Sequence, residues 1–98
     1  MNNTVNLAVQ VLPLHTTKEE AHRIIDVAIA SIHASGLKYV VCPFETVIEG
    51  PYDSVMQLLN SMQEACYTAG ATELIINMKL HRNITKSLAI DDKIGKYK

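Results

Sequence analysis

Two glutamates flank a hydroxyl group in the middle of the chain, where Phe44-Glu45-Thr46-Val47-Ile48-Glu49 precedes Gly50-Pro51. Residues four apart in an extended strand share a face, so Glu45 and Glu49 can point toward one site. Paired carboxylates perform general acid–base catalysis when burial raises the pKa of one of them. A carboxylate beside the Thr46 hydroxyl can instead hold a cationic or amine-bearing ligand. We expect ligand binding here rather than catalysis; the alternative is two solvated charges at a turn.

The other reactive side chains form no recognisable catalytic or metal-binding motif. His22 and His33 lie three turns apart on a predicted helix, and the sequence has no HxH or HxxxH pair, so we predict no metal site. No GxSxG, GxGxxG or P-loop is present, and neither Cys42 nor Cys66 has a neighbouring His. Two cysteines without a CxxC motif predict buried thiols in a reducing compartment. We therefore expect a protein that is not an enzyme and carries no cofactor.

The composition is that of a small globular protein. A chain of 98 residues with 48% hydrophobic residues predicts one domain over residues 1–98. The net charge of -1 provides no electrostatic footprint for nucleic acid or an anionic membrane, so we expect neither partner. No apolar run approaches the roughly 20 residues that cross a bilayer. The first four residues lack a basic region, so we expect no secretory signal and a cytoplasmic location.

The hydrophobic periodicity predicts six elements in the order β-α-β-β-α-β. Strands are expected at residues 5–12, 37–44, 45–49 and 73–80. The first helix begins with the capping box Thr17-Lys18-Glu19-Glu20, ends near Ser35 and is closed by Gly36. The second helix takes Asp53 as its N-cap and is closed by Gly70. The core spans about residues 5–82, and residues 83–98 are expected to form a tail that packs loosely, or onto a partner subunit.

This order of elements predicts an α+β fold, namely a ferredoxin-like βαββαβ sandwich with a four-stranded antiparallel sheet and two helices on one face. The other face of the sheet is too apolar to remain in water, so we expect it to pack on another copy of the chain. That face is predicted to carry Ala8, Gln10, Leu12, Val40, Cys42 and Ile75.

The fold alone does not determine a function, because many unrelated functions share it. RNA-recognition modules of this fold place aromatic residues on their strands, but only 5% of this chain is aromatic. Metal chaperones of this fold use a CxxC motif, which this sequence lacks. A small-molecule binder and a regulatory module remain.

The sequence resembles the YkoF-like small thiamine-binding proteins over roughly residues 5–94. The central Thr-Val-Ile-Glu-Gly is the most specific part of the match. One departure is His15 in a short loop, where the family usually has a glycine and a longer loop. The matching parts are Val9-Gln10-Val11-Leu12-Pro13-Leu14, Ser35-Gly36-Leu37-Lys38-Tyr39, Thr46-Val47-Ile48-Glu49-Gly50, Ala69-Gly70-Ala71, Arg82 and Lys93.

The resemblance implies a homodimer or homotetramer, assembled through its sheets, that binds thiamine or its hydroxymethylpyrimidine moiety without catalysis. Glu49, Thr46 and Gln10 would contact the thiazolium cation and the aminopyrimidine, and Phe44 or Tyr39 would form an apolar wall. In the alternative, Thr46 and Glu49 pair locally to stabilise a turn. The other function left open is a structural or regulatory oligomeric module that binds a different small ligand or none.

Overall fold

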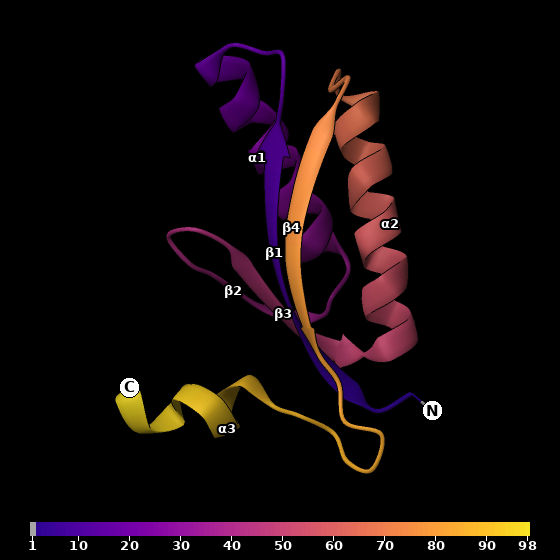
Figure 1. Cartoon of the computed structure of the whole chain (residues 1–98), viewed down its shortest axis with the longest axis vertical. Coiled ribbons are helices and arrows are strands. Elements are labelled where there is room, and N and C mark those ends of the chain that lie inside the picture. The colour runs from indigo at the N-terminus through magenta and orange to yellow at the C-terminus, as the bar shows by residue number, and fades with distance from the viewer. Residues whose placement is uncertain (1) are drawn as a thin grey trace.

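The computed structural model describes residues 2–98 and combines two long helices with a four-stranded antiparallel sheet, so the predicted α+β class is confirmed (Figure 1). The strands lie in the order β2-β3-β1-β4. None of the helices in this part of the chain is long and apolar enough to span a membrane. The elements are β1 (Thr4–Pro13), α1 (Lys18–Ala34), β2 (Lys38–Val41), β3 (Thr46–Pro51), α2 (Tyr52–Thr68), β4 (Leu74–His81), α3 (Ile90–Ile94) and the 3-10 helix η1 (Gly95–Tyr97).

The core forms around β1, which lies between β3 and β4. Alternate side chains of β1 are buried, as the period of two predicts. They share one cluster with residues from both long helices. The cluster residues are spaced by four along α1 and by three or four along α2, as expected for one face of a helix. The members of this cluster are Val5, Leu7, Val9, Val11, Ile24, Ala28, Ile32, Ile48, Val55, Leu58, Met62 and Cys66.

The predicted cap of α1 is confirmed, but only one half of the capping box forms. The Thr17 Oγ1 accepts a hydrogen bond from the backbone N–H of Glu20 at 3.1 Å. The Glu20 carboxylate does not reach back to the cap; it binds the Arg23 guanidinium at 2.7 Å. Arg23 also donates to the Ala69 carbonyl at 2.7 Å, so this side chain joins α1 to the end of α2.

The start of α2 differs from the prediction. Strand β3 continues through Gly50 and Pro51, and α2 begins at Tyr52, so Asp53 is not the N-cap. Pro51 occupies the cap position without a side-chain hydrogen bond, because its fixed φ of -58° suits a residue that leads into a helix. Asp53 lies in the first turn, where its negative charge favours the helix N-terminus.

Strand β2 is shorter than the predicted 37–44. It ends at Val41, and a tight loop follows in which the Cys42 N–H donates to the Glu45 carbonyl at 2.8 Å. Pro43 lies inside this loop and has no N–H for a strand ladder, which explains the early end of the strand. The predicted strand 45–49 accordingly starts one residue later, at Thr46.

The C-terminal segment is joined to its own chain by hydrogen bonds to β1, and most of its side chains from residue 84 onward are exposed. The Leu88 N–H donates to the Thr4 carbonyl at 3.0 Å, and the Thr4 N–H donates to the Ser87 hydroxyl at 2.9 Å. Beyond these contacts the chain forms α3, whose Ile90 is only 4% exposed. In Figure 1, α3 lies near one end of the sheet, below β2.

Candidate functional site

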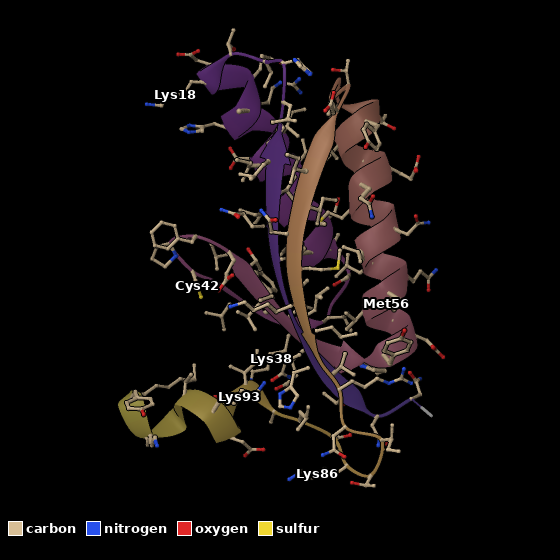
Figure 2. All side chains as sticks on the ribbon, viewed as in Figure 1. Lys18, Lys38, Cys42, Met56, Lys86 and Lys93 are labelled. Atoms are coloured by element: carbon tan, nitrogen blue, oxygen red, sulfur yellow. The ribbon has the colours of Figure 1, made fainter. Side chains whose placement is uncertain are left out.

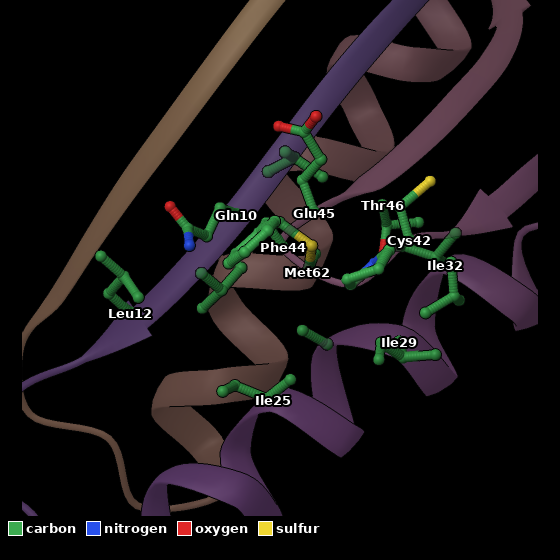
Figure 3. A pocket seen from close by; sticks show the side chains of 15 residues that line it. Gln10, Leu12, Ile25, Ile29, Ile32, Cys42, Phe44, Glu45, Thr46 and Met62 are labelled. Atoms are coloured by element: carbon green, nitrogen blue, oxygen red, sulfur yellow. The ribbon is translucent and has the colours of Figure 1, made fainter.

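A cavity of about 240 Å³ opens between β1, α1 and the β2–β3 loop (Figure 3). Its walls are mainly aliphatic, and its polar side chains come from β1, the loop and the first residue of β3. Such a concave apolar site with a few polar groups is the usual form of a small-molecule site. The cavity is lined by Val9, Gln10, Val11, Leu12, Ile25, Ala28, Ile29, Ile32, Val41, Cys42, Pro43, Phe44, Glu45, Thr46 and Met62.

One edge of β1 is free of a strand partner beside this cavity. The pairing of β1 with β3 ends at Val9 and Thr46, whereas its pairing with β4 continues to Pro13 and Leu74. Residues 10–12 therefore have a neighbouring strand on one side only. The backbone N–H and C=O groups that point to the other side are available to a ligand.

Four polar or aromatic side chains stand among the aliphatic residues that line the cavity. Gln10 is oriented by a hydrogen bond from Asn77 Nδ2 to its Oε1, at 3.2 Å, which leaves its amide N–H groups as donors. Thr46, which carries a hydroxyl, is 6% exposed and also lines the cavity. Glu45 adds a carboxylate, and the Phe44 ring is 81% exposed at the loop tip.

The structure brings together three of the five predicted site residues. Gln10, Phe44 and Thr46 line the cavity, whereas Tyr39 and Glu49 do not. The Tyr39 hydroxyl lies 2.8 Å from Nδ1 of His33, where it joins β2 to the last turn of α1. The ligand-binding roles of the five residues stay predictions.

Thr46 and Glu49 lie on opposite faces of β3, so the predicted local pair between them is wrong. The burial of β3 alternates, with Thr46 and Ile48 inside the core layer and Glu49 on the other face. The Glu49 Oε1 instead accepts a hydrogen bond from the Ile90 N–H at 2.6 Å. Glu45 precedes the strand, in the loop, so the period of two does not place it on the face of Glu49.

Sequence reasoning did not identify the helical wall of the cavity, which Ile25 and Ile29 of α1 provide. Both are half-buried, next to the fully buried positions of the helix. The available signal was the width of the apolar stripe on this helix. When the apolar stripe of a helix is wider than the surface that packs into the core, the residues at its margin can line a neighbouring cavity.

The two cysteines have different environments. Burial raises the pKa of the Cys66 thiol, whose sulfur lies 3.8 Å from the Ile24 carbonyl oxygen, so this thiol is inert core packing as predicted. The prediction of a buried thiol is wrong for Cys42, which is only half-buried because it lies in the loop after β2, at the cavity wall. Within residues 2–98, no three His, Cys, Asp or Glu side chains gather in a way that could hold a metal ion.

Comparison with known proteins identifies the family. Residues 7–98 match the thiamine-binding protein family. A UPF0045 protein of Clostridium perfringens is 30% identical over 96 residues, which cover 98% of this chain and 99% of that protein. A DUF77 domain structure from Bacillus cereus is 34% identical, covers 100% of this chain and 93% of its own, and superimposes with a TM-score of 0.91.

A Thermotoga maritima structure, provisionally assigned to thiamine biosynthesis or salvage, has the same fold, with a TM-score of 0.88. Its identity is 24%, and the match covers 97% of this chain and 99% of that one. The family resemblance seen in the sequence is confirmed by the match over residues 7–98. This chain belongs to the thiamine-binding protein family.

Proposed function

We propose that the protein binds thiamine or its hydroxymethylpyrimidine moiety, without catalysis, in the cavity along the free edge of β1. The observation that carries the proposal is the edge of β1 at residues 10–12, which has no strand partner on the side of an apolar cavity of about 240 Å³. Membership in the thiamine-binding protein family supports a thiamine-related role. The proposal rests on a ferredoxin-like arrangement, in which both long helices lie on one face of the sheet.

The aminopyrimidine ring suits the inner part of the cavity. Its amino group and ring nitrogen place a donor and an acceptor side by side, which is the pattern that an unpaired strand edge also presents. The aliphatic side chains of Leu12 and Ile29 would cover the faces of the ring. The cavity is smaller than the roughly 300–1,000 Å³ of sites for drug-sized ligands, so it would enclose one ring and leave the rest of the ligand at the rim.

The thiazolium cation suits the rim of the cavity. The Glu45 carboxylate would attract the positive charge, and the exposed Phe44 ring would offer a negative aromatic face. Hydroxymethylpyrimidine has no such permanent charge. Glu45 would therefore distinguish thiamine from its pyrimidine moiety, whereas Gln10 and Thr46 would contact both.

Calorimetric titration with thiamine and with hydroxymethylpyrimidine tests this proposal. We expect saturable binding of both. We expect Glu45→Gln to weaken thiamine binding about fivefold, since a partly exposed ion pair contributes up to about 1 kcal/mol, and to leave the pyrimidine unaffected. Gln10→Ala should weaken both ligands. Glu64→Gln is the matched control, because it removes an exposed charge on α2 away from the cavity.

Two results would count against ligand binding at this cavity. Absence of saturable heat for both ligands at millimolar concentration would leave the structural or regulatory module as the function. Equal loss of affinity in Glu45→Gln and Glu64→Gln would show a general charge effect rather than a contact. Glu49→Gln and Tyr39→Phe are titrated as well. We expect neither to change the affinity, because neither residue lines this cavity.

We further propose that the protein is a cytoplasmic homodimer or homotetramer that associates through the open sheet face. Of the residues expected on that face, Ala8, Val40 and Cys42 line a cavity together with α3 residues. Gln10, Leu12 and Ile75 do not line it. Ile75 is 45% exposed, which favours burial against a second copy. Two free thiols are typical of a reducing compartment.

Sedimentation velocity tests the association. We expect an oligomer for the unmodified protein and a shift toward monomer in Ile75→Lys, because a charge would have to be buried in the interface. Ile84→Lys is the matched control, since Ile84 is 63% exposed in the segment after β4. A monomer at high concentration, or equal behaviour of the two variants, would refute this interface.

A further inference from the structure

The polar side chain that β1 contributes to the proposed thiamine site is held by a neighbour on β4. The strand register places Gln10 directly opposite Asn77, so both side chains lie on one face of the sheet. Asn77 Nδ2 donates a hydrogen bond to Gln10 Oε1 at 3.2 Å. Gln10 lines the cavity, whereas Asn77 does not. Asn77 can therefore influence a ligand in the cavity only through Gln10.

The support comes from β4 because β3 does not reach this part of β1. The pairing of β1 with β3 ends at Val9, whereas its pairing with β4 continues to Pro13. In Figure 2, Cys42 marks the loop on one side of β1, and β4 runs along the other side. Among the described strands, β4 alone pairs with β1 at Gln10, so a residue of β4 is in place to hold its side chain.

The hydrogen bond from Asn77 decides which end of the Gln10 amide faces a ligand. The two ends have nearly the same shape but opposite roles, because the oxygen accepts hydrogen bonds and the nitrogen donates two. Since Oε1 is engaged by Asn77, Nε2 is the end left for the cavity. Figure 3 shows the Gln10 amide nitrogen on the side of Leu12 and Phe44, which both line the cavity. The cavity therefore presents a donor at this point.

A donor at this point can distinguish two pyrimidines of nearly the same size and shape. In a 4-aminopyrimidine, the ring nitrogen beside the amino group is an acceptor, and the amino group is a donor. In the 4-oxo analogue both roles are reversed, because that ring nitrogen carries the hydrogen and the exocyclic oxygen accepts. The aliphatic walls of the cavity cannot separate two such rings, whereas a fixed hydrogen-bond donor can.

We propose that Asn77 is a positioning residue that makes the site select a 4-aminopyrimidine over its 4-oxo analogue. The inference rests on the proposed function, which assigns the pyrimidine ring to this cavity. The Gln10 N–H would donate to the ring nitrogen, and a carbonyl on the free edge of β1 would accept from the amino group. The 4-oxo ring would set its own N–H against that of Gln10 and its oxygen against the carbonyl, which leaves polar groups unpaired.

The role of Asn77 does not require it to be open to solvent. Asn77 is exposed in the single chain, on the sheet face through which we propose that two copies associate. It needs contact with Gln10 and not with the ligand, which reaches Gln10 from the cavity. A hydrogen bond is stronger where water is excluded, so burial of the pair by a second copy would fix the Gln10 amide more firmly.

Calorimetric titration of the full chain with hydroxymethylpyrimidine and with its 4-oxo analogue tests the proposal, because neither ligand carries a permanent charge. We expect the unmodified protein to bind the amino form about tenfold more tightly, the effect of one unpaired polar group. Asn77→Asp should reverse the preference. A carboxylate only accepts hydrogen bonds, so Gln10 Nε2 would turn toward β4 and Oε1 toward the cavity. Asn77→Ala leaves the amide free to adopt both orientations, so the preference should shrink.

The ratio of the two affinities is measured within one variant, so a change in folding or association that weakens both ligands equally cancels. In the Gln10→Ala background, Asn77→Asp should leave this ratio unchanged, because Asn77 acts through Gln10. Asn60→Asp is the matched control, since Asn60 is exposed on α2 and does not line the cavity.

Two kinds of failure can be told apart. Saturable binding with the same ratio in Asn77→Asp as in the unmodified protein would overturn the role of Asn77 and leave the proposed function standing. Equal affinity of the unmodified protein for the two pyrimidines would do the same. Absence of saturable binding of either pyrimidine would instead refute the proposed function, and the role of Asn77 with it.

Discussion

The Glu49 carboxylate accepts a hydrogen bond from the Ile90 backbone N–H at 2.6 Å, across 41 positions of the chain. This contact joins the central strand β3 to the start of α3. A second link lies beside it, because Lys38 of β2 binds Asp91 at 3.1 Å. Together they hold the C-terminal segment against the sheet, where α3 lines a cavity with Ala8 and Val40.

We predict that Glu49→Leu will loosen the C-terminal segment without unfolding the core. A hydrogen bond to a charged group contributes roughly 1.5–3 kcal/mol, and Leu offers no acceptor to the Ile90 N–H. Hydrogen exchange of the Ile90 amide should accelerate at least about tenfold, while core amides of β1 stay protected. Glu64→Leu provides the control. Unchanged exchange at Ile90 would show that other contacts hold α3.

We predict an acid-sensitive attachment of α3 at Asp91. Hydrogen bonds and charge from Lys98 and Lys38 hold the pKa of the Asp91 carboxyl below its usual value. A folded-state pKa below the unfolded one means that the stabilisation is complete above the ordinary Asp pKa of about 3.9. It is lost as the pH falls through the lower folded-state value.

Carbon-13 NMR titration of the Asp91 carboxyl measures this effect directly. The midpoint should lie below about 3.9 and move upward in Lys38→Met, which removes one cation. High salt should move it in the same direction, because the groups are exposed and ionic strength screens them. A midpoint at or above the ordinary value in low salt would contradict the prediction.

We predict that two leucines of the same strand will respond very differently to truncation. Leu7 is 0% exposed at the centre of the core, so Leu7→Ala should lower the free energy of unfolding by about 2–5 kcal/mol. Leu12 is half-buried on the opposite face, so Leu12→Ala should cost much less. Urea denaturation of both variants tests this ordering. Equal losses would mean that the face of Leu12 is also closely packed.

We predict that Gly50 is required for packing rather than for its backbone angles. A Cβ at this position would lie 3.0 Å from Cδ2 of Leu37, and no positive φ demands glycine there. Gly50→Ala should therefore destabilise the fold by about 1–3 kcal/mol through overpacking. In a double-mutant cycle, Leu37→Ala should recover part of that loss. Strictly additive losses would place the clash elsewhere.

The periodic elements could be predicted because their signals are local. The alternation in β1 and the Thr17 cap of α1 are properties of adjacent residues, and both predictions are confirmed. The start of α2 was predicted at Asp53 because Asp is a favourable N-cap. The prediction failed because Pro51 can lead into a helix without a cap, and Gly50 allows the strand to pass close to Leu37.

The candidate site could be predicted only in part. Gln10, Phe44 and Thr46 line one cavity, whereas Glu49, which was grouped with them, does not line it. The grouping followed the motif shared with the family, whereas residues three apart in a strand, such as Thr46 and Glu49, lie on opposite faces. Glu45 was recognised as a carboxylate near the site, and its place at the cavity rim depends on the loop that begins at Cys42.

The sequence by itself determined the α+β class and the buried face of β1, because both follow from the spacing of apolar residues. It also determined the family, through motifs that stand in order along the chain. Only the tertiary structure decided where along β1 the pairing with β3 ends. It also decided that the Glu49 carboxylate accepts a hydrogen bond from the start of α3 rather than pairing with Thr46. These features depend on contacts between distant segments, whose free energy no local pattern of residues encodes.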